Sequence, residues 1–393
     1  MTTAVIVDAV RTAGGKRNGK LANWHAVDLA SEPLKALQER NDLDPATVDD
    51  VITGCVMQVG EQSLNIARNA VLAAGWPESV PATSIDRQCG SSQQAIHFAA
   101  QGVIAGAYDI VVASGVESMT RTPMGSSVVP DLGYPFGPRM TARYESRGGL
   151  VGQGIGAEMI ADRWDITRED LDAFSVRSHH RAAQATAEGR FENEIVGLPV
   201  RDADGVDTAE IFKVDEGIRP DSSLEVLAGL KPAFKPDGGK VTAGNSSQIT
   251  DGASAVLIMS EEKAQSLGLT PRARFHAFAL AGSDPITMLT GPIPATRAVL
   301  ERAKLSLDEI DLVEINEAFA SVVLAWEREL HPDADRVNVN GGAIALGHPL
   351  GASGAKLMAT LLNELERSGG RYGLLTMCEG GGMANATVIE RLG

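Results

Sequence analysis

Cys89 is the first residue of this chain whose type and position suggest chemistry. It follows a strand-like run and precedes a helical pattern in which Ala95, Ala99 and Val103 share one face. Cys89 therefore lies at the N-terminus of an expected helix, where partial positive charge and free backbone N–H groups favour a thiolate. We expect its thiol pKa to fall below the usual value of about 8.5. The alternative is a small buried side chain, which is the commoner role of a free cysteine.

His348 is the second candidate, in a segment from 338 to 356 that contains five glycines ahead of a helical pattern beginning near Ser353. Glycine allows the backbone to approach a ligand closely, and a histidine held in such a turn is placed to move a proton. A lone histidine is more often structural, but the glycine-rich turn favours a catalytic role over one on a helix face.

Two further segments carry polar or reactive groups. Cys378 ends a strand-like run and is followed by three glycines, of which Gly380 is the first. Backbone N–H groups in such a turn can line an oxyanion site. Asn316 stands at a strand-to-helix junction, where it would cap the helix or hold a water, and the residue type favours the cap.

The elements that position these residues read as an α/β fold with largely buried strands. Short β-branched runs at 4–7, 51–52 and 110–113 alternate with helical patterns, and runs at 312–315, 337–339 and 374–377 do the same later in the chain. Between them, one helical segment near 168–188 stands among Gly/Pro-rich stretches.

An internal repeat relates the two ends of the chain. Residues 43–51 are echoed by 305–313 at an offset of 262, and 108–115 by 372–379 at an offset of 264. By this repeat Cys378 aligns with Ser114 and Cys89 aligns near Gly351, at the start of the helix after His348. The duplication therefore predicts that Cys89, His348 and Cys378 converge on one pseudo-twofold axis.

Composition limits the classes of function. A length of 393 residues favours two or three lobes, and a net charge of −16 argues against nucleic acid or an anionic membrane as partner. The odd number of cysteines, three, is no disulfide framework, and the N-terminus does not read as a signal peptide, so we expect a cytoplasmic protein. No Cys or His cluster has metal-ligand spacing, so no metal is expected.

The segments around Cys89, Asn316, His348 and Cys378 resemble the thiolase family in order and spacing, and the resemblance covers the whole chain. It implies a layered αβαβα fold of two repeated halves and an acyltransferase that cleaves or forms 3-ketoacyl-coenzyme A (CoA). By resemblance, Cys89 becomes acylated, His348 activates it and the incoming CoA, and Cys378 moves the proton at the acetyl α-carbon. Asn316 fixes a water that with His348 forms one oxyanion hole, and the N–H groups of Cys89 and Gly380 form the other.

The resemblance also implies domain limits and partners. Residues 1–118, completed by 248–270, would form the first half, 271–393 the second, and 119–247 a loop-rich insertion covering the CoA and acyl site. CoA and acyl-CoA are expected as substrates, with no permanently bound cofactor, and the chain is expected to form a homodimer or homotetramer.

Five residues are expected to contact CoA or the acyl group. Ser247 matches the position that meets the pantetheine, and Ala243 lies in the same run. Arg219 resembles the arginine near the adenine nucleotide. Phe234 and Ala318 resemble walls of the pocket.

Departures from the family pattern occur at 152–153 and at 379. Gly152 and Gln153 stand where short-chain acetoacetyl thiolases tend to have a His-Met pair, which favours an acyl group larger than acetyl. Glu379 is an unusual neighbour of Cys378; a carboxylate pointing inward would raise that thiol's pKa.

Three other readings compete. A decarboxylating ketosynthase of the same fold generally pairs its cysteine with two histidines, whereas here Cys378 stands in place of the second. A non-catalytic thiolase-like acyl carrier would be expected to have lost a nucleophile, and both cysteines are present. A nicotinamide-dependent oxidoreductase is disfavoured, because the glycines from Gly152 to Gly156 do not form the dinucleotide fingerprint and follow no suitable strand.

Overall fold

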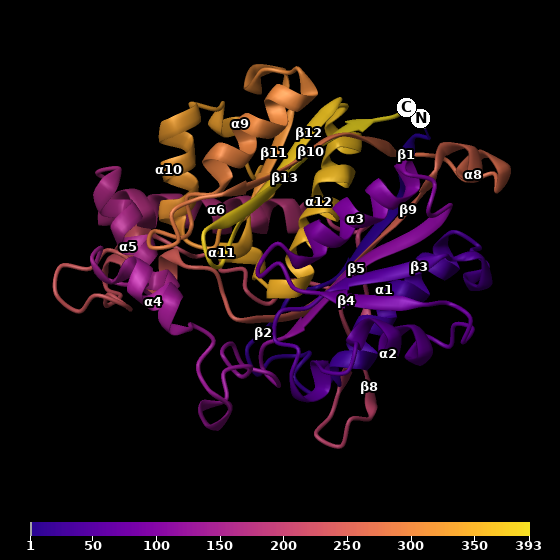
Figure 1. Ribbon diagram of the computed structural model, residues 1–393, viewed down its shortest axis with the longest axis horizontal. Coiled ribbons are helices and arrows are strands. Elements are labelled where there is room, and N and C mark those ends of the chain that lie inside the picture. The colour runs from indigo at the N-terminus through magenta and orange to yellow at the C-terminus, as the bar shows by residue number, and fades with distance from the viewer. Residues whose placement is uncertain (1) are drawn as a thin grey trace.

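A single hydrogen-bonded sheet runs through both halves of the chain in the computed structural model, which describes residues 2–393 (Figure 1). Its strands follow the order β11-β12-β13-β10-β1-β9-β5-β3-β4, so β1 and β10 form the seam. The first half contributes β1 (Ala4–Thr12), β3 (Asp50–Gly54), β4 (Ala82–Ile85), β5 (Ile110–Ser118) and β9 (Thr250–Ser260). The second half contributes β10 (Ala273–Gly282), β11 (Leu312–Ile315), β12 (Tyr372–Glu379) and β13 (Met383–Arg391). The short strands β2 (Gly15–Lys16) and β6 (Ile195–Val196) pair with β9 and β1.

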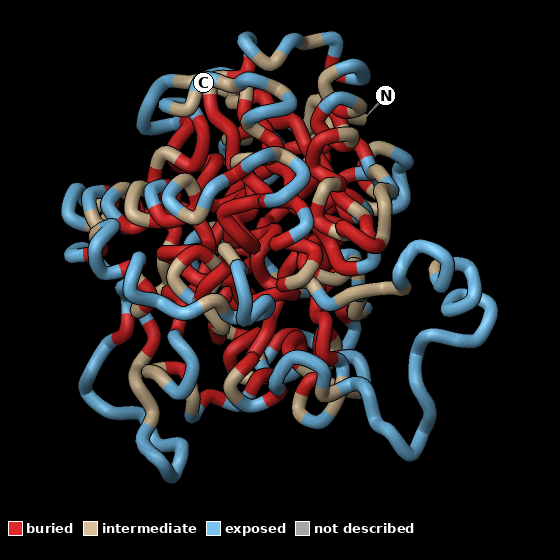
Figure 2. Tube along the Cα trace, turned by 90° about the vertical axis from the view of Figure 1, so that its left-hand side faces the viewer, coloured by how far each residue is buried: buried red, intermediate tan, exposed pale blue. Residues whose placement is uncertain are grey.

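Helices form three layers about this sheet. The inner layer is α3 (Ser91–Ile104) and α12 (Ser353–Ser368), which pack against each other and share an apolar core with strands of both halves. The outer helices are α1 (Ala26–Arg40) and α2 (Ile66–Ala73) on the first half and α9 (Pro292–Ala303) and α10 (Ala320–Leu330) on the second. Buried residues fill the centre, and exposed segments extend from it as loops (Figure 2).

The two halves repeat one strand order, which confirms the expected duplicated α/β fold. In the first half β3, β5, β9 and β1 lie side by side, with β4 added beyond β3; in the second, β11, β12, β13 and β10 follow the same order. The pairs β3–β5 and β11–β12 are both parallel, as the repeat requires. Because α3 and α12 occupy equivalent places, their N-terminal ends meet in the interior of the molecule.

The strand expected at 337–339 is wrong, since the structure has only an isolated bridge between Val313 and Val337. Asn338 adopts a left-handed backbone conformation with φ of +45°, which takes the chain out of the sheet. Its side chain replaces the strand pairing: Oδ1 accepts from the Ile315 amide and Nδ2 donates to the Ile315 carbonyl, both at 2.9 Å. A side chain thus satisfies backbone groups that a strand would otherwise have paired.

Residues 119–247 contain more regular structure than the one helix expected there. The expected helix is α6 (Arg168–Ala187), which begins with a capping box between Thr167 and Asp170. Further elements are α4 (Pro138–Glu145), α5 (Gln153–Arg163), α7 (Leu224–Ala228) and a hairpin of β7 (Leu198–Arg201) and β8 (Asp207–Phe212). Outside this segment, α8 (Glu261–Ser266) follows β9 and α11 (Ala343–Leu346) precedes His348. The limits proposed for the insertion stay a prediction.

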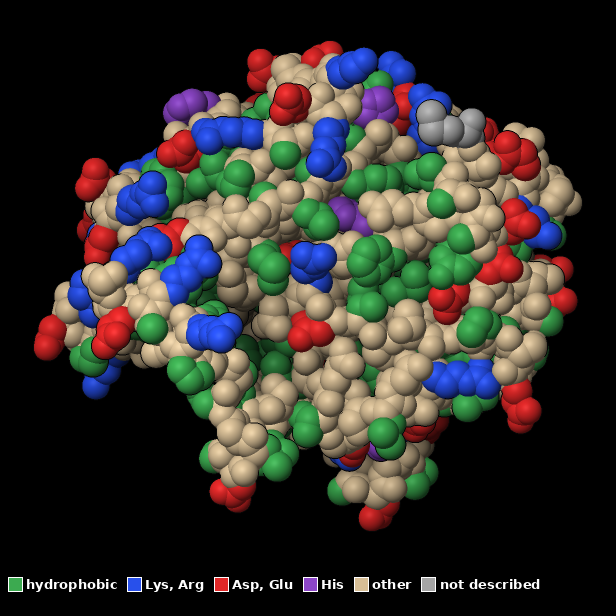
Figure 3. Space-filling view, viewed as in Figure 1, with side chains coloured by type: hydrophobic (Ala, Val, Ile, Leu, Met, Phe, Trp, Pro, Cys, Tyr) green, Lys and Arg blue, Asp and Glu red, His purple; other side chains and the backbone are tan. Residues whose placement is uncertain are grey.

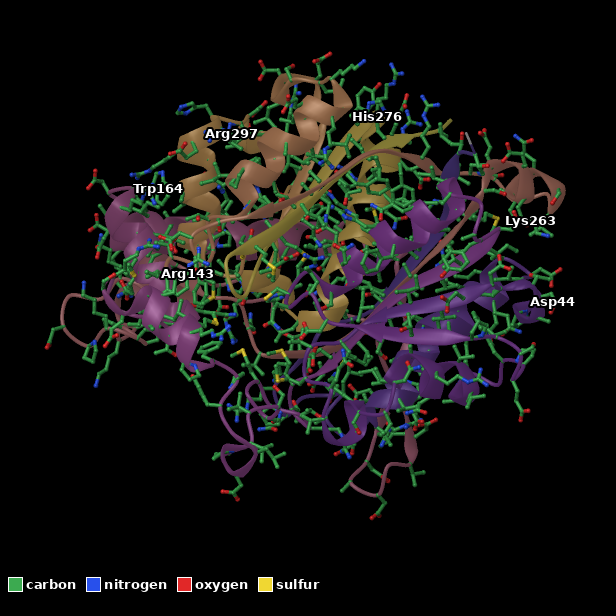
Figure 4. The ribbon with its side chains drawn as sticks, viewed as in Figure 1. Asp44, Arg143, Trp164, Lys263, His276 and Arg297 are labelled. Carbon is green, nitrogen blue, oxygen red and sulfur yellow. The ribbon has the colours of Figure 1, made fainter. Side chains whose placement is uncertain are left out.

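The insertion packs on the second half of the chain. Trp164 follows α5 and donates through Nε1 to Glu329 of α10 at 3.0 Å, and Figure 4 places it with Arg143 of α4 on the same side of the molecule. No helix within residues 2–393 is long and apolar enough to cross a membrane.

Three histidines, His97, His179 and His348, are buried in the folded chain. Burial lowers the pKa of His97 and of His348 to about 3, and that of His179 to about 4. An unfolded histidine has a pKa of about 6.5, so the unfolded chain binds more protons between these values. Folding stability is therefore greatest above pH ~6.5 and falls as the pH drops toward the folded-state values.

We expect His97→Gln to weaken this acid sensitivity. A buried neutral histidine costs about 1.4 kcal/mol of unfolding free energy per pH unit in that window, and the variant lacks one such contribution. Urea unfolding at several pH values between about 4.5 and 7 measures the slope. His331→Gln, which alters an exposed histidine, is the control and should leave the slope unchanged. Parallel curves for wild type and His97→Gln would contradict the prediction.

Candidate active site

One cavity of about 530 Å³ brings together seven of the ten predicted site residues. It lies between the sheet and the insertion, and its lining includes Gln153, Met119 and Leu289 besides the predicted residues. The seven are Cys89, His348, Ser247, Arg219, Phe234, Ala243 and Ala318. The other three, Asn316, Cys378 and Gly380, do not line the cavity but lie beside the residues that do.

Cys89 lies just before α3, whose N-cap is Gly90. The preceding residue, Gln88, has φ of +49°, a conformation that is uncommon for a side chain of this size and turns the thiol out of the strand direction. The backbone N–H groups of Cys89 itself and of Gly380 act on the thiol and lower its pKa. Gly90 is required here, because a Cβ would lie 2.1 Å from Oε1 of Glu379.

The expectation of a lowered Cys89 pKa is wrong. Burial raises the pKa of the thiol to about 12, and the nearby carboxyl of Glu379 raises it further, which outweighs the two N–H groups. Cys89 is only 4% exposed. At rest Cys89 is therefore a thiol, and a base would be needed to generate its thiolate.

His348 supplies a neutral imidazole beside Asn316. Burial lowers the pKa of His348 to about 3, with a smaller contribution from Lys356. Its Nδ1 is 2.5 Å from Ser353 Oγ, and that hydroxyl donates to the Pro349 carbonyl at 2.8 Å. The hydroxyl proton is thereby occupied, so the oxygen accepts Nδ1–H and Nε2 is left as the basic nitrogen.

The turn before His348 depends on one glycine. Gly347 has φ of +81°, and a Cβ there would lie 2.3 Å from Oγ1 of Thr250. The same Oγ1 accepts the His348 amide at 3.1 Å. His348 is therefore held by a hydrogen bond from its backbone amide and by another at its ring nitrogen Nδ1.

The expectation that Asn316 caps a helix is wrong. It follows β11 directly, and the N-cap of α10 is Phe319, three residues later. Nδ2 of Asn316 lies 3.4 Å from Nε2 of His348. Its Oδ1 is buried and has no hydrogen-bond partner within residues 2–393. A buried amide oxygen with this property suits an ordered water, the second role considered for this residue.

Cys378 and Gly380 occupy the end of β12. The Cys378 thiol is fully buried, and burial raises its pKa well above the ordinary value, with added contributions from Cys89 and Glu379. The expectation that an inward-pointing Glu379 would raise that thiol's pKa agrees with this result. Gly380 places its N–H on Cys89 and packs against the side chain of Gln88.

Several residues that hold the site together were missed in the sequence. Glu117 on β5 accepts from the amides of Val56, Met57 and Gly351, and so ties the loop after β3 and the turn after His348 to β5. Ser353, which orients His348, was recognised only as the start of a helix. Glu117 stands in an all-buried strand and had no turn or glycine signal to reveal it.

The cavity combines cationic and apolar linings. Lys16, Arg17 and Arg219 line it, in a chain whose net charge is −16. Phe234 packs edge-to-face on Phe319 with ring centroids 6.0 Å apart, giving an apolar wall. Figure 3 shows acidic and basic side chains interspersed on the face that it draws. The lining suits an anionic ligand with an apolar part.

No group of His, Cys, Asp or Glu side chains in the described chain could hold a metal ion.

Comparisons with known proteins agree with this geometry. The family model described as "Thiolase, N-terminal domain" matches residues 4–262, and "Thiolase, C-terminal domain" matches residues 269–391. A steroid 3-ketoacyl-CoA thiolase of Mycobacterium tuberculosis is 52% identical, over 100% of this chain and 95% of that protein. A 3-ketoacyl-CoA thiolase of Shewanella frigidimarina is 48% identical over 100% of both. The chain therefore belongs to the thiolase family.

A solved structure is similar over the same range. The crystal structure of the Bacillus anthracis acetyl-CoA acetyltransferase matches with a TM-score of 0.90 and 40% identity, covering 100% of this chain and 99% of that one. The layered fold with repeated halves is thus the thiolase fold. The roles of the individual site residues stay predictions.

We expect Ser353→Ala to slow catalysis while leaving substrate binding intact. Without the hydroxyl, Nδ1–H loses its acceptor and the imidazole can take the other tautomer or turn, so kcat should fall about 10- to 100-fold with little change in KM. Steady-state thiolysis kinetics measure both constants. Ser321→Ala is the matched control, because Ser321 is also a buried serine at the start of a helix and its hydroxyl has no partner among the described residues. Equal kcat for Ser353→Ala and wild type would show that Ser353 does not orient His348 for catalysis.

Proposed function

We propose that the chain is a thiolase that cleaves a 3-ketoacyl-CoA into acetyl-CoA and a shortened acyl-CoA, or runs the reverse condensation of two acetyl-CoA molecules to acetoacetyl-CoA. One observation carries the proposal: the Cys89 thiol lines one cavity with the neutral imidazole of His348, and a second buried thiol, Cys378, lies close enough to interact with it electrostatically. The family membership and the names of the relatives support the same activity.

The first half-reaction uses Cys89 and His348. The Cys89 proton passes to Nε2 of His348, and the thiolate attacks the 3-keto carbonyl. The carbonyl oxygen gains negative charge, which one of the two oxyanion holes stabilises, either the N–H groups of Cys89 and Gly380 or the water on Asn316 with His348. Thiolate and imidazolium form together, so each favours the charged state of the other.

Carbon–carbon cleavage requires a second acid. When the tetrahedral carbonyl re-forms, the bond between the α- and β-carbons breaks, and the electron pair remains on the acetyl-CoA enolate. Cys378 gives its proton to the α-carbon, which yields acetyl-CoA and leaves the acyl group on Cys89. The proton held by His348 then passes to the Cys378 thiolate, which restores both groups. CoA loses its thiol proton to the neutral His348 and attacks the acyl-enzyme. Acyl-CoA is released, and the departing Cys89 thiolate recovers that proton from His348.

CoA binding is proposed to follow the lining of the cavity. Arg219 would contact the nucleotide, and Ser247 and Ala243 the pantetheine. Phe234 and Ala318 would wall the acyl group. Lys16 and Arg17 offer further positive charge on the same lining.

The competing enzyme class is the ketosynthase. A ketosynthase generally offers two histidines to its cysteine, whereas among the residues lining the cavity His348 is the one histidine. A non-catalytic acyl carrier would not need the tautomer of His348 to be fixed, and here two hydrogen bonds fix it. Both observations favour the thiolase.

We further propose that the acyl group is larger than acetyl. Gly152 is the N-cap of α5, and a Cβ placed on it meets no atom within 4 Å, while its neighbour Gln153 lines the cavity. Space is therefore open where a larger side chain would stand. The relative that is 52% identical is named for steroid substrates, which supports a bulky acyl group.

A homo-oligomer in the cytoplasm completes the proposal. The segment between β5 and α4 exposes Leu132, Tyr134 and Phe136, and Figure 3 draws hydrophobic side chains on this projection at the lower left. Exposed apolar groups of this kind support self-association. Light scattering that gave only the 41.3 kDa monomer would exclude the oligomer. The three cysteines are free, which supports a reducing compartment.

We expect Cys378→Ala to separate the two half-reactions. Acylation of Cys89 from acetyl-CoA should persist, because it needs only Cys89, His348 and an oxyanion hole. Carbon–carbon bond formation and cleavage should fall about 10²- to 10⁴-fold, since the acid at the α-carbon is absent. Mass spectrometry of the acetylated peptide and thiolysis rates test the two parts. An acetyl group on the Cys55 or Cys378 peptide in wild type, or thiolysis intact in the variant, would contradict the assignment.

We expect Gly152→Leu to shorten the acyl preference. In wild type, kcat/KM for thiolysis should rise roughly fourfold per added methylene until the pocket is full, since each buried methylene contributes about 0.8 kcal/mol. The variant should lose this rise and keep its rate with acetoacetyl-CoA. Gly137→Leu is the matched control, because Gly137 is also an extended N-cap glycine with open space, but its neighbour Pro138, unlike Gln153, does not line the cavity. A steady fall beyond acetoacetyl-CoA in wild type would show a short-chain enzyme.

A further inference from the structure

Glu379 is a buried carboxyl group that the proposed mechanism does not use. It ends β12, is fully buried, and neither of its oxygens has a hydrogen-bond partner within residues 2–393. A carboxylate buried in this way is costly when ionised, whereas the protonated acid is tolerated. A group that is fully enclosed yet unpaired calls for an explanation beyond packing.

The position of Glu379 places it against the nucleophile. Its Oε1 would lie 2.1 Å from a Cβ on Gly90, so the carboxyl rests on the backbone of the residue that follows Cys89. Asn385 of β13 lies on the same spot and donates to the Gly90 carbonyl at 3.0 Å, not to Glu379. The carboxyl group thus lies at the start of α3 without a hydrogen-bond or ion-pair partner among the described residues.

The charged and titratable groups around Glu379 come from its own strand, from the turn and start of α3, and from the loop against Gly382. The turn before α3 contributes Arg87 and Asp86, which oppose each other in their effect on the carboxyl. Its own strand and the start of α3 contribute the thiols of Cys378 and Cys89. In the loop that packs against Gly382, Asp284 is paired with Arg147 at 2.7 Å. Burial and Asp86 outweigh Arg87 and raise the pKa of Glu379 to about 8.

We propose that Glu379 is a positioning residue that controls the ionisation of two thiols. While Glu379 is protonated, Cys89 and Cys378 can become thiolates; when Glu379 is ionised, its negative charge suppresses both thiolates. This inference rests on the proposed thiolase reaction. A negative charge beside Cys89 opposes the thiolate in the first half-reaction, and the same charge opposes the Cys378 thiolate left after enolate protonation. Glu379 acts through the two thiols and touches no substrate.

The expected result is an alkaline limb in kcat/KM for thiolysis that depends on Glu379. With the pKa of Glu379 at about 8, ionisation leaves roughly one tenth of the enzyme active at pH ~9, so the wild-type rate should fall about tenfold from pH ~7. Glu379→Gln keeps the shape and stays neutral, so it should match wild type at pH ~7 and lose less than about twofold at pH ~9.

Glu314→Gln is the matched control. Glu314 on β11 is another buried glutamate with an oxygen that lacks a partner in the described chain, and burial, then Glu317, raise its pKa well above the ordinary value. It does not contribute to the pKa of either active-site thiol. Its variant should keep the wild-type alkaline limb. Substrate and CoA ionise equally in all three assays, so they cancel in the ratio of variant to wild type.

Alkylation of Cys89 by iodoacetamide gives a readout that does not require thiolase activity. Between pH ~7 and ~9 the rate should rise about tenfold more in Glu379→Gln than in wild type, equivalent to one pKa unit of the thiol. Wild type that alkylates at Cys89 but neither acylates nor thiolyses would refute the proposed function and leave the alkylation test of Glu379 valid.

A second variant guards against a folding defect in Glu379→Gln. Arg87→Gln removes the cation that favours ionisation of Glu379, so the alkaline limb should move to higher pH. A purely structural role would not produce this shift. An unchanged alkaline limb in both Glu379→Gln and Arg87→Gln, with alkylation rates parallel to wild type, overturns the inference.

Discussion

The buried ion cluster around Arg11 is the interaction on which the arrangement of the chain depends. The Arg11 guanidinium, on β1, is fully enclosed and donates to Glu194 at 2.6 Å and to Asp215 at 2.9 and 3.0 Å. Lys356 of α12 lies 4.0 Å from Asp215 and donates to the carbonyls of Leu346 and Gly347. Two cations and two anions thus balance, and each would be strongly destabilising if left alone. The first strand, the insertion and the inner helix of the second half must therefore come together as one unit, and the turn that carries His348 is formed in the process.

Duplication explains why the chemistry is located at the inner layer. Because α3 and α12 occupy equivalent places, both helices begin at the same depth, and the turns that precede them carry Cys89 and His348. The ends of β11 and β12 reach the same level and contribute Asn316 and Cys378. Each half supplies residues that the other lacks, so neither half contains a complete site. Phe234 and Arg219, from the segment between β5 and β9, complete the wall of the cavity.

The sequence predicted the positions of helices and strands more fully than the pKa values of the site residues. The strand at 312–315 and the helices beginning near Ser353 and at 168 follow from apolar periodicity and turn residues, which are local signals. Val337 failed as a strand because the side chain of Asn338 took over the pairing, and hydrogen bonds between distant segments leave no periodic trace. The thiol pKa of Cys89 was misjudged for a related reason. A helix N-terminus can be read from neighbours in sequence, but burial and the approach of Glu379 depend on the tertiary fold.

A raised thiol pKa is compatible with the proposed reaction once the whole cycle is considered. An acyl-cysteine open to bulk water would be lost to hydrolysis, so the site must exclude bulk water, and this burial raises the pKa of the thiols of Cys89 and Cys378. The fixed N–H groups and the oriented imidazole of His348 offset this at the moment when charge develops, because they are already aimed and need not reorganise. In the proposed complex the anionic part of the substrate would be met elsewhere, by Arg219 and the other cations of the cavity lining. The cations that would bind the substrate are thus separate from the thiols that would become charged during the reaction. This separation would let an acidic protein hold an anionic thioester while its two thiols stay neutral until they react.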